Sequence, residues 1–259
     1  MIWSRHFLLV IGFCMALLSS PVLSAKQFKV LLFTKTAGWH HQSILEGVNA
    51  VKVLAEKHHF DYEWHEDAKQ FNSKNLDRFD AIIFLNTTGD VLNDEQQKAM
   101  KLFIQSGKGF VGVHSASDTE YQWPWYTQLV GRMFVIHPAI QTAKINVVQA
   151  DFPGSSLLPS SFLWTDEYYH FSEPLSENLK YILTVDESTY KPAAQWGDVR
   201  VSGMGDFHPI AWYQEIDGGR SFYTALGHLP ATYQDPLFLQ HLFGGIYWAA
   251  TGKGVGKID

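Results

Sequence analysis

The chain changes abruptly from apolar to reactive side chains at Gly112-Val113-His114-Ser115-Ala116. The residues that lead into the turn, 110–113, predict a buried strand. A strand that ends in a turn with small residues on both sides is typical of a nucleophile elbow, which presents one reactive side chain at the edge of a sheet. Because His114 stands at the centre instead of Ser or Cys, we expect an exposed imidazole that transfers protons. The alternative is a histidine that fills the turn by bonding to backbone carbonyls.

Three further titratable residues are candidates for the same chemistry. Glu167 lies in a segment dense in polar and aromatic groups, where it could act as an acid or base; the alternative is a half-buried strand with alternate residues in water. His228 follows an apolar run, in a Gly-His-Leu-Pro loop. His41 precedes a predicted helix, whose N-terminus would lower the pKa of a nearby imidazole. We therefore take His114, Glu167 and His228 as catalytic candidates and His41 as a substrate ligand.

The other candidates would bind substrate. Asp118 could orient an imidazole or bind a sugar hydroxyl, although it could equally cap a following helix. Either Tyr168 or Tyr169 could give Glu167 an aromatic or hydroxyl neighbour. Flat aromatic faces commonly stack on sugar rings, and core packing is their plainer role. The predicted substrate-binding set is Trp39, His41, Asp118, Trp123, Tyr168 and His208.

The sequence indicates no metal site and no cofactor. It has no HExxH motif and no close spacing of His with carboxylates of a known metal-binding kind. Metal ligands would have to converge from distant loops, which spacing cannot reveal. A metal-dependent hydrolase built on the histidines is therefore kept only as an alternative.

Alternating strand and helix patterns must position these residues. We expect strands at 28–33, 60–64, 81–85 and 110–113, with a helix opened by a Ser43–Glu46 capping box and another capped by Asn93 or Asp94. This order predicts an α/β fold with a doubly wound, mostly parallel sheet.

The second half of the sequence is richer in strands. We expect them at 144–148, 181–185, 210–215 and 221–226, with a hairpin turn at 217–219 and a last helix capped by Asp235. Ligands of doubly wound sheets bind beyond the carboxyl ends of the strands. The loops that carry His41, His114 and His228 should therefore meet in one crevice.

The first 25 residues predict a signal peptide. An apolar run from Phe7 to Leu18 is too short to span a bilayer, and small residues up to Ala25 provide a cleavage site; a retained anchor is the alternative. The single cysteine, Cys14, would leave with this segment. We therefore expect one domain, 26–259, without disulfides, in the periplasm or secreted, and with no membrane span after cleavage.

The charge balance and the aromatic content limit the classes of molecule that the protein is expected to bind. The formal net charge is −6 and no Lys/Arg stripe is present, which disfavours nucleic acid. Nine Trp and eleven Tyr residues suit a protein that binds a small sugar or glycoside.

Several separate motifs then resemble the trehalose-utilisation (ThuA-like) family, over about residues 29–252. They are residues 35–44, 112–119, 164–169 and 208–212 and Gly227-His228. The resemblance implies a class I glutamine amidotransferase-like, flavodoxin-like fold. It places His114 at the position of the glutaminase cysteine and His228 at that of the triad histidine.

That resemblance also bears on function. Without a thiol no thioester can form, so glutamine hydrolysis is not expected. The family is tied to disaccharide and glycoside use, with 3-keto sugars made by a partner sugar dehydrogenase as suspected substrates. We therefore expect an exported protein of carbohydrate metabolism that uses acid–base chemistry on a glycoside or 3-keto-glycoside. The alternatives are a non-catalytic sugar-binding module on the same fold and the metal-dependent hydrolase.

Overall fold

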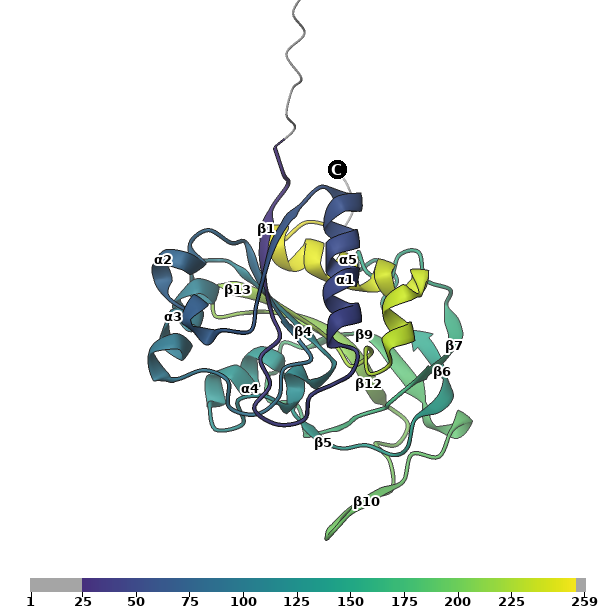
Figure 1. Cartoon of the computed structure of the whole chain (residues 1–259). Coiled ribbons are helices and arrows are strands. Elements are labelled where there is room, and N and C mark those ends of the chain that lie inside the picture. The colour runs from purple at the N-terminus through teal and green to yellow at the C-terminus, as the bar shows by residue number, and fades with distance from the viewer. Residues whose placement is uncertain (1–24, 255–259) are drawn as a thin grey trace, which may run out of the picture.

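The computed structural model describes residues 25–254, so that residues 1–24 of the predicted signal peptide lie outside the described part. A nine-stranded sheet runs through the molecule in the order β2-β1-β3-β4-β13-β12-β9-β6-β7. Helices cover both of its faces (Figure 1). The expected α/β architecture is therefore confirmed, with extra strands added on one side.

The parallel half of the sheet has the flavodoxin-like order 2-1-3-4, followed by β13. Its central strands are short apolar runs that are buried along their whole length, as expected for strands covered on both faces. The strands are β2 (Asp61–His65), β1 (Lys29–Phe33), β3 (Ala81–Leu85), β4 (Gly109–Val113) and β13 (Gly219–Thr224).

The other half is antiparallel and begins at the predicted hairpin. Asp217 and Gly218 both have positive φ, 51° and 88°, which two-residue hairpin turns of the primed type require. The hairpin joins β12 to β13 in register. The added strands are β12 (His208–Ile216), β9 (Lys180–Asp186), β6 (Gln141–Val147) and β7 (Ser161–Asp166).

Five α-helices complete the layers of the described chain. α1 and α5 lie together on one face, and α2, α3 and α4 lie on the other (Figure 1). Their bounds are α1 (Ile44–His58), α2 (Ser73–Leu76), α3 (Asp94–Gln105), α4 (Pro124–Val130) and α5 (Pro236–Thr251). Short elements fill the loops: β5 (Phe134–Ile136) pairs with β8 (His170–Phe171), β10 (Ala194–Trp196) pairs with β11 (Val199–Val201), and 3₁₀ turns lie at Ala68–Gln70, His114–Asp118, Glu187–Thr189 and Pro230–Gln234.

Two of the three predicted helix caps are confirmed. Asn93 forms a reciprocal capping box with Gln96, and the Asp235 carboxylate accepts a hydrogen bond from the Leu237 N–H. The Ser43–Glu46 box is wrong. Ser43 makes no side-chain cap; its hydroxyl instead donates to the Gly227 carbonyl at 3.1 Å. A contact between distant loops has therefore displaced the local cap.

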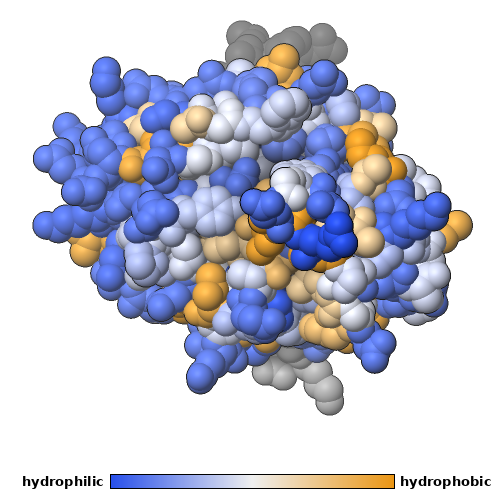
Figure 2. Space-filling model, turned by 90° about the horizontal axis from the view of Figure 1, so that it is seen from below, coloured by the Kyte–Doolittle hydropathy of each residue, from blue (hydrophilic) through white to orange (hydrophobic). Residues whose placement is uncertain are grey.

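The carboxyl ends of the parallel strands point to the face that is lowest in Figure 1, where the β10–β11 hairpin projects. Viewed from below, this face carries hydrophobic residues in small separate groups between hydrophilic ones (Figure 2). Within residues 25–254, no helix combines the length and the apolar character needed to cross a bilayer.

Candidate functional site

Four loops bring one ionisable side chain each to the carboxyl edge of the sheet. They follow β1, β4, β7 and β13 and carry His41, His114, Glu167 and His228, respectively. One nitrogen or carboxylate oxygen from each residue lies within 4.8 Å of the corresponding atoms of the other three. The structure thus brings together all three predicted catalytic residues and one predicted substrate ligand.

His114 occupies a strained turn, as an elbow requires. Its φ of 50° lies in the left-handed region that non-glycine residues rarely adopt. The small neighbours are needed because a Cβ on Gly112 would lie 3.0 Å from the Tyr223 ring and 3.2 Å from the Ala116 Cβ. The turn leads into a 3₁₀ segment, His114–Asp118, and not into an α-helix. The elbow geometry is therefore present with imidazole at its centre.

The predicted exposure of His114 is wrong, because its side chain is completely buried. Its Nδ1 lies 2.7 Å from the Ala225 carbonyl oxygen, which can only accept, so Nδ1 carries a proton. The Tyr223 hydroxyl donates to the His114 carbonyl at 2.7 Å and fixes the turn from the other side. The bond to a backbone carbonyl was the plainer alternative, yet it places Nε2 on the side of Glu167 and His228.

Glu167 lies at the centre of the cluster. Its Oε2 is 3.1 Å from His228 Nδ1 and 3.6 Å from His114 Nε2, and its Oε1 is 3.2 Å from His137 Nε2. Burial raises the pKa of the carboxyl, but contacts with His114 and His228 outweigh burial and hold the pKa at about 2. The carboxylate is therefore ionised at neutral pH.

Asp166 fixes Glu167 and His228 relative to each other. Its fully buried carboxylate accepts from the backbone N–H groups of Glu167 and His228 through Oδ1, at 2.9 and 3.1 Å. Oδ2 accepts from the Gly227 N–H at 3.0 Å and from the Trp164 indole at 3.2 Å. One carboxylate therefore joins the end of β7 to the loop after β13.

His41 and His228 have opposite pKa shifts. Burial, followed by the nearby His114, lowers the pKa of His41 to about 2, so its imidazole is neutral. Burial also acts to lower the pKa of His228, but its hydrogen bond to Glu167 outweighs burial and raises the pKa. The neighbouring His40, in contrast, is exposed.

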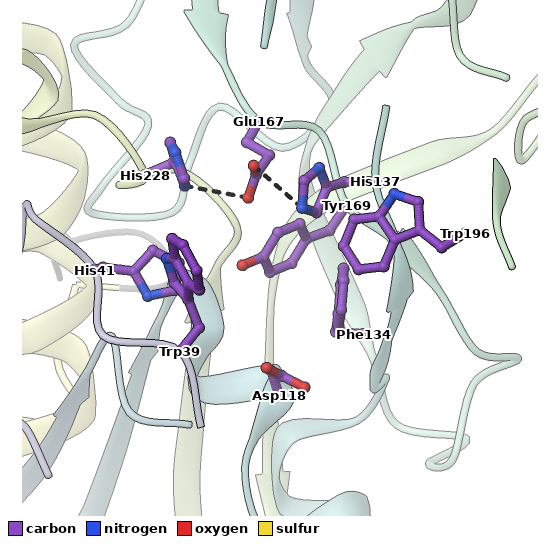
Figure 3. Close-up of a pocket in the computed structure, with 9 residues that line it drawn as sticks. All are labelled: Trp39, His41, Asp118, Phe134, His137, Glu167, Tyr169, Trp196 and His228. Atoms are coloured by element: carbon purple, nitrogen blue, oxygen red, sulfur yellow. Dashed lines mark ion pairs between the residues drawn. The ribbon is translucent and has the colours of Figure 1, made fainter. Parts of the chain in front are cut away.

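A cavity of about 440 Å³ opens over the cluster (Figure 3). Asp118 lies across it from Glu167 (Figure 3). The Tyr121 hydroxyl donates to the Asp118 carboxylate at 2.8 Å. Burial raises the pKa of Asp118, the Tyr121 bond opposing the shift. Trp39, which is 71% exposed, lies beside His41 at the rim. The lining residues are Trp39, His41, Asp118, Phe134, His137, Glu167, Tyr169, Trp196 and His228.

Three predicted substrate ligands lie outside the cavity. Tyr168 is buried and donates its hydroxyl to the Trp164 carbonyl, so that the next residue, Tyr169, faces the cavity instead. Trp123 stacks against Tyr126 and packs at a tilt against Trp125, beside the start of α4.

His208 is the third, and it is fully buried behind the site. Its Nδ1 lies 2.8 Å from the Glu187 carboxylate and its Nε2 lies 2.8 Å from the Tyr169 carbonyl oxygen. His208 therefore positions the backbone of a cavity residue and cannot bind substrate itself.

Four lining residues were not among the predicted ligands. The Tyr169 hydroxyl lies 2.8 Å from His114 Nε2, and His137 contacts Glu167 directly. Phe134 and Trp196 form an aromatic wall around His137, with the Trp196 ring 4.5 Å from the imidazole. In the sequence, the His137-Pro138 step and the Tyr168-Tyr169 pair could have indicated two of these residues, whereas no pattern indicated Phe134 or Trp196.

Comparison with known structures supports the fold. A ThuA-like protein from Bacteroides uniformis superposes with a TM-score of 0.73 at 20% identity, covering 92% of this chain and 98% of that one. A ThuA-like protein from Parabacteroides merdae gives 0.72 at 21% identity, covering 90% and 93%. A β-galactosidase from Bacillus circulans gives 0.53 at 15% identity, and this chain covers 31% of its length. No curated protein matches the chain.

The family assignment rests on the sequence itself. The model of the ThuA family, described as trehalose utilisation, matches residues 29–249. This span runs from the first residue of β1 almost to the end of α5 and includes every residue of the cluster. The chain therefore belongs to the ThuA family.

Proposed function

We propose that this ThuA protein cleaves a glycoside or a 3-keto-glycoside by proton transfer, without a covalent intermediate. The observation that carries the proposal is a single ionised carboxylate, Glu167, in contact with His114, His137 and His228 at the base of a cavity. Such a cluster stores and moves protons near neutral pH. Membership of a family described as trehalose utilisation supports a carbohydrate substrate.

The pKa shifts of the cluster are consistent with acid and base roles for its residues. Glu167 is ionised and holds a proton on His228, whose pKa it raises, so this pair can deliver or accept a proton at neutral pH. Neutral His41 can donate a hydrogen bond to a substrate oxygen without adding charge. The acid and base roles therefore fall on Glu167 and the histidines around it, with Asp118 available across the cavity.

A 3-keto-glycoside would react by elimination. The ketone at C3 acidifies the C2–H bond, and a site base removes that proton. The electron pair of the C2–H bond forms a C1=C2 double bond while the glycosidic C1–O bond breaks. The departing oxygen takes a proton from a site acid and leaves as the alcohol. Each step needs only proton transfer, which the cluster provides.

The walls of the cavity suit a sugar ring. Trp39 and Trp196 offer partly exposed aromatic faces, and Phe134 lies between Tyr169 and Trp196. The volume, about 440 Å³, falls within the range of about 300–1,000 Å³ typical of small-molecule sites. Glutamine hydrolysis is not proposed, because the only cysteine of the chain is Cys14, in the predicted signal peptide.

The test is incubation of the purified protein with 3-keto-glucosides and with their parent glycosides, with products followed by chromatography. Glu167→Gln keeps the shape of the side chain and should abolish turnover, whereas Glu173→Gln, at an exposed glutamate, should leave it unchanged. Absence of turnover of every compound would refute the enzymatic proposal. Calorimetry that shows sugar binding without turnover would favour the binding-module alternative.

Two parts of the proposal concern the context of the protein. We propose export to the periplasm or beyond, which mass spectrometry of the mature N-terminus would test. A keto-glycoside substrate also requires an enzyme that oxidises the C3 hydroxyl group, so we propose a partner sugar dehydrogenase.

A further inference from the structure

The three most closely spaced atoms of the cluster form a triangle. His114 Nε2 and His228 Nδ1 are 3.3 Å apart, His228 Nδ1 and Glu167 Oε2 are 3.1 Å apart, and His114 Nε2 and Glu167 Oε2 are 3.6 Å apart. His41 adds a fourth atom within 4.8 Å of the others. These residues come from four loops that are far apart in the sequence, so their clustering is produced by the fold.

The edges of this triangle match those of a transition-metal site. Zinc binds imidazole nitrogen and carboxylate oxygen at about 2.0–2.2 Å, so ligand atoms at tetrahedral angles lie about 3.3–3.6 Å apart. The observed edges of 3.1, 3.3 and 3.6 Å span this value. His114 Nε2, His228 Nδ1 and Glu167 Oε2 therefore have the separations expected of three ligand atoms of one ion.

The hydrogen bonding around His114 also suits a metal ligand. Because its Nδ1–H donates to the Ala225 carbonyl, Nε2 is the ring nitrogen that faces Glu167 Oε2 and is the one available to a metal ion. Metal-bound histidines typically donate their other ring N–H to a carbonyl or a carboxylate in this way. A cation between His114 Nε2 and Glu167 Oε2, which lie 3.6 Å apart, would take the place of a shared proton.

We propose that His41, His114, Glu167 and His228 bind one divalent first-row transition-metal ion, of the type of Zn²⁺ or Mn²⁺. Three imidazoles and one carboxylate form a donor set suited to such ions, and His41, Glu167 and His228 also line the cavity. Sequence spacing could not indicate the site because its ligands lie far apart in the chain. The inference rests on the proposed function in one respect: the bound ion would polarise the carbonyl of a keto-sugar and so acidify its C2–H bond. With the ion bound, Glu167 and His228 act as ligands, and proton transfer passes to Asp118 and His137, which line the same cavity.

Tyr169 competes with the ion in the structure as it stands. Its hydroxyl is hydrogen-bonded to His114 Nε2 at 2.8 Å, the nitrogen that the metal would bind. Binding therefore breaks this hydrogen bond and leaves the hydroxyl beside the ion, at the wall of the cavity. Tyr169 consequently sets the metal affinity without being a ligand.

The test uses the full mature chain, purified without a polyhistidine tag, dialysed against EDTA and then titrated with Zn²⁺, Mn²⁺ or Co²⁺ by calorimetry. We expect one ion per chain, and a visible absorption spectrum for the Co²⁺ form that reports nitrogen and oxygen ligands. Glu167→Gln and His228→Ala should each weaken binding about 100-fold or more, since even outer-shell changes cost about 10–100-fold. His40→Ala, at an exposed histidine next to His41, is the matched control and should bind normally.

The outcomes separate this inference from the proposed function. Failure to bind any of the three ions stoichiometrically would overturn it, as would unchanged affinity in Glu167→Gln and His228→Ala when circular dichroism shows both folded. Full turnover of a 3-keto-glycoside by the EDTA-dialysed protein would refute the metal's role in the reaction while the proposed function stands. Stoichiometric binding at these residues with no turnover of any glycoside would support the site and refute the proposed function.

Discussion

Replacement of Asp166 by Asn should damage the site and the stability of the protein together. Each Asp166 oxygen accepts two hydrogen bonds: Oδ1 from the backbone of Glu167 and His228, and Oδ2 from Gly227 and the Trp164 indole. An amide has only one acceptor oxygen. Whichever way the substituted amide is turned, its NH₂ group faces two N–H donors and two hydrogen bonds are lost.

The magnitude follows from these four bonds. A hydrogen bond to a charged group contributes about 1.5–3 kcal/mol, so two lost bonds cost about 3–6 kcal/mol at this completely buried position. Folded domains are stable by about 5–15 kcal/mol, so the variant remains largely folded at low temperature with a much lower unfolding midpoint. Because Glu167 and His228 lose a common anchor, turnover and metal affinity should fall in the same variant.

Urea unfolding followed by tryptophan fluorescence measures the loss, and Asp235→Asn provides the matched control. At Asp235 the structure shows one oxygen accepting one backbone N–H, from Leu237 at 2.8 Å, to cap α5. Asn caps helices about as well as Asp, so this change should alter the free energy of unfolding by less than about 0.5 kcal/mol. If Asp166→Asn costs less than about 1 kcal/mol, or no more than the control, our account of the anchor is wrong.

Three further outcomes are expected. Tyr169→Phe removes the hydroxyl that is hydrogen-bonded to His114 Nε2, and the loss of this bond at a buried nitrogen costs about 1–3 kcal/mol. Metal binding recovers this cost, so calorimetry should show that the variant binds the ion about 5–150-fold more tightly. Weaker binding would contradict the competition between Tyr169 and the ion. For Glu187, burial acts to raise the pKa, but hydrogen bonds from His208 and two backbone N–H groups lower the pKa below 4.5. The ionised Glu187 therefore stabilises the fold above pH 4.5, and this contribution is lost as the pH falls through the folded pKa. The free energy of unfolding of Glu187→Gln should depend less steeply on pH below 4.5 than that of the unmodified protein, and an unchanged slope would count against this pairing. Trp196→Ala should raise KM or the sugar Kd about 2–10-fold and leave kcat and thermal stability unchanged. The reason is that the Trp196 ring is 48% exposed on a hairpin and contributes only to the cavity wall. If KM and Kd do not change, Trp196 is not part of the binding surface.

The parallel half of the fold was predictable because each strand is a local pattern. β3 and β4 are short apolar runs bounded by polar residues or glycine, and the α3 pattern lies between them. A parallel sheet needs such crossovers, so the element order restricts the topology strongly. The carboxyl-edge rule then indicated which loops would meet, and His41, His114 and His228 do meet.

The failures came where distant contacts override local patterns. Ser43 has the spacing of a capping box, but the Asn86 amide and the Gly227 carbonyl use its hydroxyl instead. Tyr168 was predicted to bind substrate, but Tyr169 is the one that faces the cavity. Both lie in the turn after β7, where the alternation of side chains along a strand no longer indicates which residue points inward. Burial of His114 depends on Tyr169, which covers it from another part of the chain.

The position of Glu167 explains why the site needs both halves of the sheet. His41 and His114 follow β1 and β4 in the parallel half, but Glu167 follows β7, the strand at the opposite edge of the sheet. The antiparallel strands are therefore part of the site, because they deliver the only carboxylate within the four-residue cluster. The elbow imidazole and this carboxylate together can share a proton or hold a cation at a buried position, where an isolated charge would be costly.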